Sequence, residues 1–358
     1  MAANFHRLAI AEVIKETADA KSFRFDVPDV LEPCFAFRPG QHLTLRREFD
    51  GEDVRRNYSL CVAPQDRQLK VTVKRIAGGL FSNWANDELR TGDSIEVMEP
   101  HGSFTIDMQA DRAGRYAGFA GGSGITPILS LLKTALLTEA DSRFTLIYGN
   151  RDSQSVIFLD ELARLKNRFM GRLEVHHFLS DEAEDIALFN GLLDRAKCDE
   201  ILATLIDPAD LDAAFICGPG PMMDAAEAAL LARGASPDRI HIERFTVDRP
   251  SAALAAEMQA KQELAQGLQL LITLDGRTRS IAFDAAAGNI LDSARIAGLR
   301  APFACKAGVC ATCRARVVAG KVEMAARYGL TDEEVAAGYV LTCQSIPTGA
   351  GVAVDYDA

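Results

Sequence analysis

Residues 305–313 read CKAGVCATC and place Cys305, Cys310 and Cys313 close together, and Cys343 follows further along the chain. The chain has eight cysteines in 358 residues. An even cysteine count suggests disulfides in a small secreted domain, but this chain is long and its first residues, MAANFHRLAIAEV, lack the pattern of a secretory signal. Thiolates are soft ligands that suit iron–sulfur clusters. We therefore interpret the clustered cysteines as metal ligands.

The spacing of these cysteines, C-x4-C-x2-C…C, is that of plant-type [2Fe–2S] ferredoxins. Small residues such as Gly308 lie between them, so the loop can wrap closely round a cluster and its backbone N–H groups can reach the sulfurs. A zinc site is the alternative, but four-cysteine zinc sites normally combine two Cys-x-x-Cys hooks, and this stretch has one. The predicted ligands of the [2Fe–2S] cluster are Cys305, Cys310, Cys313 and Cys343.

Length and composition limit the possible functions. A chain of 358 residues predicts two or three domains, each with its own core. The formal net charge of −11 argues against nucleic-acid binding, which needs a basic surface. No apolar run approaches the ~20 residues that cross a bilayer. We expect a soluble, cytoplasmic protein that contacts neither nucleic acid nor membrane.

Residues 1–110 contain short strand-like runs, among them KSFRFDV, QHLTL, NYSLCV and LKVTVKRI, separated by turn signals such as Pro39-Gly40 and Gly78-Gly79. This spacing predicts a small antiparallel barrel, with a β-sandwich as the alternative. In residues 111–249, strand-like runs such as RYAGFA and FTLIYGN alternate with helical ones such as ILSLLKTALL. That alternation predicts an α/β domain with a parallel sheet.

Residues 250–267 are rich in Ala, Gln and Glu, and we interpret them as a linker that is partly helical. Residues 268–358 open with two strand-like runs around an Asp-Gly turn, followed by a helical run and the cysteine cluster. We expect this part to be an α+β ferredoxin domain of the β-grasp type.

Residues 121–127, GGSGITP, lie between a predicted strand and a predicted helix. Glycines permit a tight turn and the close approach of a phosphate, and the helix N-terminus supplies amide donors. Pro127 suits the first helical position, and a plain turn is the alternative interpretation. Cys217-Gly218-Pro219 ends another predicted strand, where open parallel sheets bind their ligands. The sequence thus predicts a dinucleotide site between these two segments.

The choice between NADPH and NADH depends on charge after the next strand, where NAD sites usually carry an acidic residue and NADP sites an arginine. Here Asn150 is followed by Arg151 and then by Asp152. Arg151 can face a 2′-phosphate, so we favour NADPH, although Asp152 keeps NADH open.

Arg56-Asn57-Tyr58-Ser59 begins a predicted strand in the first domain. An arginine can hold a pyrophosphate, and a tyrosine face and a serine hydroxyl can flank a planar isoalloxazine. On its own this motif of four residues is weak evidence for a flavin site, because an ordinary strand can contain the same residues.

Together with Gly-Ser-Gly-Ile-Thr-Pro at 122–127 and Cys217-Gly218-Pro219, the motif resembles the ferredoxin–NADP reductase family, here with a fused C-terminal ferredoxin. The resemblance favours FAD over FMN and implies that a flavin mediates between hydride and single-electron transfer. It implies candidate catalytic roles for Ser59, Cys217 and Glu243. The implied flavin-binding residues are Arg56, Tyr58, Ser59, Val73, Lys74, Arg75, Gly79, Ser82 and Phe245. The implied nicotinamide-binding residues are Gly122, Ser123, Gly124, Thr126, Pro127, Asn150, Arg151, Cys217, Gly218, Pro219 and Met222.

Stretches such as FICGPGPMMDAAE and EEVAAGYVLTCQS look most like the phenylacetyl-CoA epoxidase branch of this family. That resemblance implies a partner, a multi-subunit di-iron oxygenase that receives the electrons. Alternatives are a reductase for another aromatic-ring hydroxylase or for a demethylase, and, from a different class, an iron–sulfur redox sensor.

Overall fold

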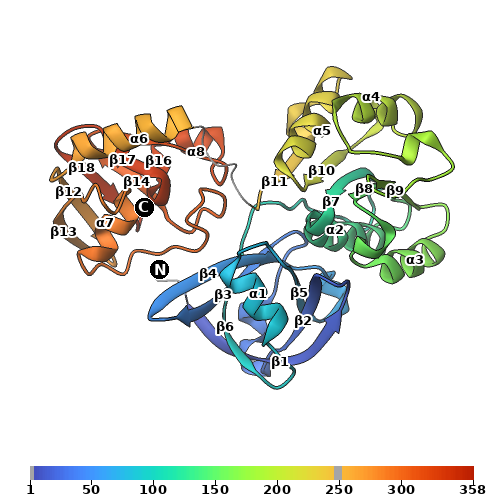
Figure 1. The fold of residues 1–358 in the computed structure, drawn as a ribbon, viewed down its shortest axis with the longest axis horizontal. Coiled ribbons are helices and arrows are strands. Elements are labelled where there is room, and N and C mark those ends of the chain that lie inside the picture. The colour runs from blue at the N-terminus through green and yellow to red at the C-terminus, as the bar shows by residue number, and fades with distance from the viewer. Residues whose placement is uncertain (1–3, 246–251) are drawn as a thin grey trace. The chain divides into compact units, whose positions relative to one another are not determined.

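The computed structural model describes residues 4–245 and 252–358 (Figure 1). One compact unit contains residues 5–54 and 58–243. A second contains residues 252–358, with the short segments 55–57 and 244–245 grouped with it. None of the helices in these described ranges is long and apolar enough to cross a membrane.

The first unit begins with an antiparallel barrel. Its strands pair in the order β4-β3-β6-β1-β2-β5. They are β1 (Phe5–Lys15), β2 (Ala20–Asp26), β3 (His42–Phe49), β4 (Glu52–Ser59), β5 (Leu69–Lys74) and β6 (Ser94–Met98). Leu60, directly after β4, bridges antiparallel to Val71 of β5, so the two edges of the sheet meet. The predicted barrel is confirmed. A 3-10 segment (Asp29–Phe35) and helix α1 (Leu80–Asp87) lie in its connections.

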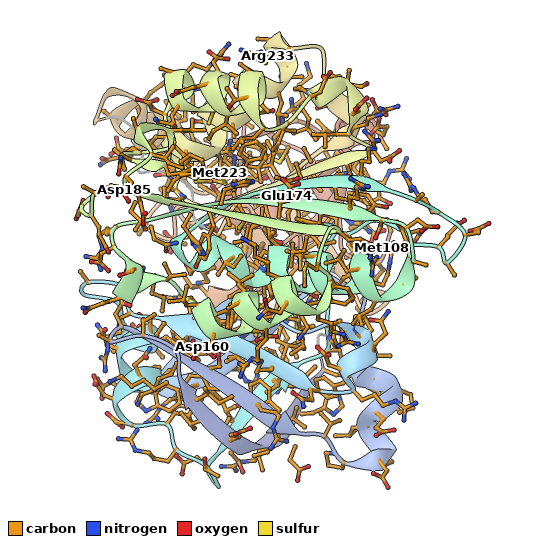
Figure 2. The ribbon with its side chains drawn as sticks, turned by 90° about the vertical axis from the view of Figure 1, so that its right-hand side faces the viewer. Met108, Asp160, Glu174, Asp185, Met223 and Arg233 are labelled. Atoms are coloured by element: carbon orange, nitrogen blue, oxygen red, sulfur yellow. The ribbon has the colours of Figure 1, made fainter. Side chains whose placement is uncertain are left out.

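The same unit continues with a parallel sheet in the order β11-β10-β7-β8-β9, which confirms the predicted α/β domain. Its strands are β7 (Arg115–Gly121), β8 (Arg143–Asn150), β9 (Leu173–Leu179), β10 (Ala213–Cys217) and β11 (Ile240–Glu243). Helices α2 (Ile125–Thr138) and α3 (Leu159–Arg168) cover one face, and α4 (Arg195–Thr204) and α5 (Gly220–Ala232) cover the other (Figures 1 and 2).

Strand β8 shows why helices lie on both faces. Its alternate residues Phe144, Leu146 and Tyr148 pack into the core shared with α2, whereas Ile147 joins the core shared with α4 and α5. A strand that is apolar on both sides needs a layer on each. Met223 of α5, labelled in Figure 2, belongs to this second core.

Helix α2 is buried along almost its whole length because it also packs on the barrel. Its Ser130 hydroxyl donates to the Val62 carbonyl at 2.6 Å. The helix begins at Ile125, after a 3-10 turn at Gly122–Gly124, so Pro127 is its third residue. The prediction that Pro127 is the first helical residue is wrong, but a proline is still tolerated there because N–H groups in the first turn have no intrahelical partner.

The second unit contains a five-stranded sheet in the order β13-β12-β18-β14-β16, in which β12 and β18 are parallel. The strands are β12 (Gln269–Leu274), β13 (Arg277–Ala282), β14 (Arg314–Ala319), β16 (Tyr339–Leu341) and β18 (Val352–Asp355). Helix α7 (Ile290–Ile296) buries Ile290, Leu291 and Ala294 in the core. A short ladder of β15 (Val322–Met324) and β17 (Ser345–Pro347) and helix α8 (Asp332–Ala336) complete the domain, which has the predicted α+β form.

The predicted linker 250–267 contains helix α6 (Ala252–Ala265), and its residues 250 and 251 lie outside the described residues. The helix is attached to the ferredoxin core: Lys261 forms an ion pair with Glu323 at 2.6 Å, and the Gln262 amide donates to the Gly288 carbonyl at 2.9 Å. Met258 packs against the same core. The domain boundaries drawn from the sequence stay predictions.

Candidate functional site

The four clustered cysteines converge in two pairs. The Cys305 and Cys310 thiols are within hydrogen-bonding distance of each other, and so are those of Cys313 and Cys343. No group of three or more His, Cys, Asp or Glu side chains in the described residues suits a single metal ion. Two pairs of thiolates are what a cluster of two irons requires, one pair for each iron, whereas a zinc ion needs all four ligands around one centre. The donor set fits a [2Fe–2S] cluster better than zinc.

The cluster loop has a backbone that leaves room for the sulfurs. Lys306 and Ala311 both adopt φ 53°, and Gly308 adopts φ 74°. A Cβ on Gly308 would lie 2.9 Å from Cγ of Gln344, so a larger residue does not fit. The Ala307 N–H donates to Cys305 Sγ at 3.3 Å, as expected for a loop whose amides tune a cluster.

Ser59 and Tyr58, at the end of β4, have surroundings that suit a ligand. Ser59 is buried, and its Oγ has no hydrogen-bond partner among the described residues. A buried hydroxyl without a partner is costly unless a bound group supplies one. Tyr58 is half-buried and lies against Phe81, with ring centroids 5.9 Å apart. Arg56 is exposed on the same strand. The residues present fit a flavin at this strand end.

The predicted flavin-phosphate residues lie between β5 and α1. Val73 and Lys74 end β5, and Gly79 immediately precedes α1. The Ser82 hydroxyl accepts a hydrogen bond from the Ile76 N–H at 3.1 Å, which fixes the loop between them. The guanidinium of Arg75 binds the Asp87 carboxylate through two nitrogens, at 2.9 and 2.5 Å.

The glycine turn after β7 fits tightly against the end of β10. A Cβ on Gly124 would lie 2.0 Å from the Cys217 carbonyl oxygen. A Cβ on Gly121 would lie 2.5 Å from Pro219 and 2.8 Å from Met222 Sδ. The fold therefore brings together the two segments that the sequence assigns to the dinucleotide.

Within the turn, the Thr126 hydroxyl donates to the Ser123 carbonyl at 3.0 Å, and the Tyr148 hydroxyl donates to the Gly122 carbonyl at 3.0 Å. These bonds hold the turn in place. Pro127 lies in the first turn of α2, and Gly218 directly follows β10, so both belong to the two segments that meet here.

Cys217 and Glu243 face each other at the carboxyl ends of neighbouring strands, where they are register partners. Cys217 is fully buried, and burial together with the Glu243 charge raises the pKa of its thiol well above the ordinary value. It is therefore a neutral thiol and not a nucleophile. The Glu243 side chain is 14% exposed, and its Oε2 has no hydrogen-bond partner among the described residues. Phe245 follows two residues later and is partly exposed.

Arg151, directly after β8, is mostly exposed, with 64% of its side chain accessible. Its nearest acidic partner is Asp19, at 3.9 Å, and the same carboxylate oxygen lies 3.7 Å from Lys74 Nζ. Two cations thus gather near the Gly122 turn, since Lys74 Nζ lies 3.5 Å from where a Gly122 Cβ would be. Asn150 precedes Arg151 at the end of the strand.

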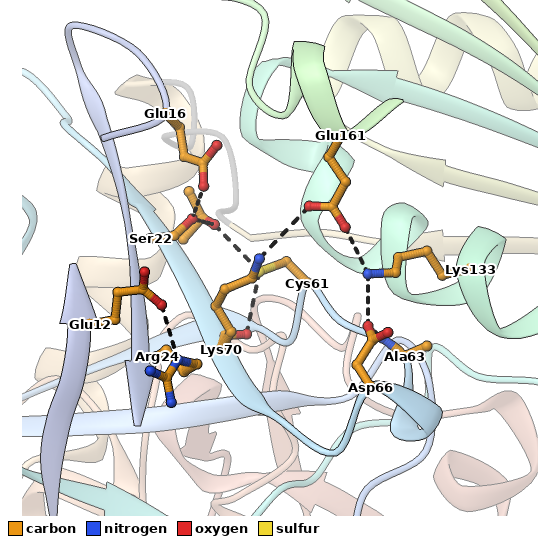
Figure 3. Close-up of polar contacts among 11 residues, drawn as sticks. Glu12, Glu16, Ser22, Arg24, Cys61, Ala63, Asp66, Lys70, Lys133 and Glu161 are labelled. Atoms are coloured by element: carbon orange, nitrogen blue, oxygen red, sulfur yellow. Dashed lines mark hydrogen bonds and ion pairs between the residues drawn. The ribbon is translucent and has the colours of Figure 1, made fainter. Parts of the chain in front are cut away.

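Sequence reasoning missed three groups of residues around this site. Asp19 links the two cations, and His42 lies 3.6 Å from Glu243. Lys133 of α2 joins the barrel to the α/β domain through Asp66 and Glu161 (Figure 3). Their partners are far away in the sequence, and no local motif marks them.

Three family descriptions match successive parts of the chain. Residues 7–106 match the oxidoreductase FAD-binding domain, residues 119–228 the oxidoreductase NAD-binding domain, and residues 272–348 the 2Fe-2S iron-sulfur cluster binding domain. The chain is 46% identical over 354 residues to a subunit of the 1,2-phenylacetyl-CoA epoxidase of Escherichia coli (strain K12), and the match covers 99% of this chain and 98% of that protein. The chain belongs to the family of oxygenase ferredoxin reductases.

Other members of this reductase family are also similar. The ferredoxin reductase component of 3-ketosteroid-9-alpha-monooxygenase from Rhodococcus rhodochrous is 38% identical, covering 95% of this chain and 93% of that protein. The solved structure of phthalate dioxygenase reductase matches with a TM-score of 0.60 and 26% identity, over 98% of both chains.

The reductase therefore carries FAD, a nicotinamide dinucleotide and a [2Fe–2S] cluster. Bound FAD can take two electrons as a hydride and return them one at a time, which the cluster requires. The protein binds these groups and orients them.

Proposed function

We propose that this reductase is the electron-delivering subunit of a phenylacetyl-CoA epoxidase. It would pass electrons from NADPH through FAD and the [2Fe–2S] cluster to a multi-subunit di-iron oxygenase. The observation that carries the proposal is the 46% identity to the Escherichia coli epoxidase subunit over nearly the whole of both chains. Fusion of the ferredoxin domain to the reductase domains supports rapid delivery, because a short tether gives an effective concentration of about millimolar.

NADPH is the proposed electron donor because Arg151 follows β8 with most of its side chain accessible to a 2′-phosphate. Lys74, which shares Asp19 with Arg151, adds a second positive charge near the phosphates. The predicted roles of Ser59, Cys217 and Glu243 at the reacting atoms belong to the same proposal. A cytoplasmic location is proposed as well, supported by eight cysteines of which none forms a disulfide and four are assigned to the cluster.

The test is to reconstitute the epoxidase reaction from this reductase and purified oxygenase subunits, with a known supply of NADPH or NADH. The protein is titrated anaerobically with NADPH and then with NADH, while flavin and cluster absorbance are followed. It is then mixed with the oxygenase subunits of a phenylacetyl-CoA epoxidase, phenylacetyl-CoA and dioxygen. We expect NADPH to bleach both chromophores and phenylacetyl-CoA to be consumed in proportion to NADPH. Rapid cluster reduction without any substrate turnover would contradict the assignment of the partner.

The second candidate is a reductase for a 3-ketosteroid monooxygenase, which the 38% identity to the Rhodococcus component supports. A parallel reaction with that oxygenase and its steroid substrate separates the two. A redox sensor would give a third result, in which cluster bands are present without flavin and NADPH does not bleach them.

A further inference from the structure

Asp19 lies in the turn between β1 and β2, and its carboxylate faces the two cations of the predicted dinucleotide site. Asp19 Oδ2 lies 3.7 Å from Lys74 Nζ and 3.9 Å from a guanidinium nitrogen of Arg151. Lys74 ends β5 of the barrel, whereas Arg151 directly follows β8 of the parallel sheet. One carboxylate oxygen of the barrel is therefore close to a cation from the barrel and to a cation from the α/β domain.

The position of this carboxylate is fixed independently of both cations. The Thr17 hydroxyl donates to Asp19 Oδ1 at 2.7 Å, and the Asp19 N–H donates back to the Thr17 hydroxyl at 3.3 Å. The Asp19 carbonyl accepts a hydrogen bond from the Arg75 N–H at 2.7 Å, which ties the turn to the end of β5. Oδ1 and the backbone thus orient the side chain, and Oδ2 is the oxygen that faces Lys74 and Arg151.

The contacts of Asp19 Oδ2 with the two cations are ionic and not directional. Both distances exceed the ~3.2 Å that is usual for an N–H···O hydrogen bond, so the carboxylate does not orient either cation. It acts as a negative charge between them. The Asp19 and Lys74 side chains are only 28% and 25% exposed, so water screens this charge less than it would at an open surface.

The other carboxylates near Arg151 in the sequence and in the neighbouring loop have different partners. Asp152 Oδ1 accepts a hydrogen bond from the Ser155 N–H at 2.8 Å, as the cap of a short 3-10 turn. The Glu182 carboxylate accepts one from the Ser153 N–H at 2.7 Å. Among the described residues, only the carboxylate of the β1–β2 turn lies within 4 Å of the Arg151 guanidinium.

A dinucleotide brings phosphate groups to the same two cations. Lys74 Nζ lies beside the Gly122 turn, where the pyrophosphate is expected, and Arg151 is where a 2′-phosphate is expected. Each phosphate must share its cation with the carboxylate, and like charges a few ångströms apart repel each other. NADH and NADPH both carry the pyrophosphate, but only NADPH carries the 2′-phosphate. The carboxylate should therefore weaken the binding of NADPH more than that of NADH.

We propose that Asp19 is a specificity-determining residue: its carboxylate competes with the coenzyme phosphates for Lys74 and Arg151 and so limits the preference for NADPH over NADH. The inference rests on the proposed reductase function and adds the barrel turn to the segments that select the coenzyme. In the coenzyme-free protein the carboxylate has a second effect. It offsets the repulsion between two cations that both lie within 4 Å of one oxygen.

The first experiment removes the charge and keeps the shape. Asp19→Asn retains an oxygen that can accept the hydrogen bond from the Thr17 hydroxyl. In steady-state kinetics of the FAD- and cluster-loaded full chain, we expect KM for NADPH to fall about fivefold and KM for NADH to fall at most about twofold. Added salt should weaken NADPH binding more in the variant than in the wild type, because the site has gained one net positive charge. A higher KM for NADPH in Asp19→Asn, or equal changes for the two coenzymes, would overturn the inference.

The second experiment tests whether Asp19 acts through Arg151. Inhibition constants are measured for adenosine 2′,5′-bisphosphate and for AMP, which lacks the 2′-phosphate, in Asp19→Asn, in Arg151→Gln and in the double variant. Asp19→Asn should tighten binding of the bisphosphate about fivefold when Arg151 is present and much less when it is absent. An equal gain in both backgrounds would refute the competition for Arg151.

Two further variants separate charge at this position from shape and from total charge. Asp19→Glu keeps the charge and should keep the ratio of kcat/KM for NADPH to that for NADH within about twofold of the wild type. Asp210→Asn removes a carboxylate that pairs with Arg115 at 2.6 Å, at the start of β7 and so at the opposite end of the parallel sheet. It should leave the ratio unchanged.

Flavin content and melting temperature identify any variant that has failed to fold. If the wild-type protein does not reduce its cluster with NADPH, the proposed function fails. If it does, and Asp19→Asn gives the same coenzyme ratio as Asp210→Asn, only the role of Asp19 is refuted.

Discussion

Replacing Lys133 with methionine tests whether the barrel and the α/β domain are held together by a partly buried ionic network. Lys133 Nζ lies 2.7 Å from Asp66 after the barrel strand and 2.7 Å from Glu161 of α3 (Figure 3). Only 10% of its side chain is exposed. A second lysine, Lys70 of β5, lies 3.8 Å from Glu161, further away than Lys133.

The expected loss of stability follows from what Lys133→Met leaves behind. Breaking a fully buried pair costs ~3–5 kcal/mol, because an uncompensated charge stays in the interior. Asp66 and Glu161 keep some access to water, and Asp66 also accepts a hydrogen bond from the Ala63 N–H at 2.9 Å. We therefore expect a loss of about 2 kcal/mol. At ~2–4 °C per kcal/mol for a unit of this size, the melting temperature should fall by roughly 4–8 °C.

The raised pKa of Lys133 also predicts how the stability loss in Lys133→Met changes with pH. Burial alone would lower the pKa of Lys133, but the neighbouring carboxylates of Glu161 and Asp66 outweigh it, and the pKa is raised. A raised pKa contributes stability that is complete below the unfolded value of ~10.5 and disappears as the pH rises through the folded value. The difference between wild type and variant should therefore stay constant from neutral pH to about pH 10 and close above it.

The assay is calorimetry of the FAD-loaded protein at several pH values. Arg195→Met is the control, since Arg195 pairs with Asp199 one turn further along α4 at 2.9 Å, has 47% of its side chain exposed and should cost at most ~0.5 kcal/mol. Equal losses in the two variants, or a Lys133→Met difference that persists unchanged at strongly alkaline pH, would refute the reasoning.

Further predictions concern the binding sites. Arg151→Gln should raise KM for NADPH about tenfold and leave KM for NADH nearly unchanged, because one charge-assisted contact to phosphate is worth ~1.5–3 kcal/mol; steady-state kinetics with both donors checks this. Cys310→Ser should abolish electron delivery to the oxygenase but leave hydride transfer from NADPH to flavin largely intact, as stopped-flow absorbance would show. Gly124→Ala should abolish nicotinamide binding or folding, since its Cβ would lie 2.0 Å from the Cys217 carbonyl, and dinucleotide titration with a melting curve distinguishes these outcomes. Electron transfer between the domains should depend weakly on salt, because the ferredoxin segment is tethered and carries nine acidic and nine basic residues in 268–358; a steep loss of cluster reduction rate in high salt would contradict this.

Much of the fold is predictable because local signals mark it. The alternation of apolar strands with helices defines the parallel sheet, and the spacing from Cys305 to Cys313 defines the cluster loop. Helix α1 is different, because it has only eight residues and begins after a glycine. Its sequence, LFSNWAND, has no pattern that distinguishes a helix from a loop. Its position depends on burial of Phe81 and Trp84 against the barrel, which no local pattern reveals.

The side-chain contacts of the candidate site are harder to predict from the sequence than the fold is. Glycine and proline motifs locate the dinucleotide segments, but they do not reveal which side chains lie behind them. His42 and His101 are 59 residues apart and meet only because an isolated antiparallel bridge aligns them. Likewise, Asp66 meets Lys133 only once α2 has packed on the barrel. Such pairs depend on tertiary register, which one sequence does not display.

Buried polar atoms without partners are candidate contacts for a bound cofactor. An orphan atom alone does not locate a ligand, since Trp84 Nε1 also has no hydrogen-bond partner among the described residues. Ser59 Oγ and Glu243 Oε2 are different because the family resemblance, without reference to the structure, implies that both residues lie near the flavin. Each unsatisfied atom costs ~1–3 kcal/mol, a cost that binding of FAD can offset. We expect the same binding to stabilise the folded state in proportion to the logarithm of free FAD over its Kd.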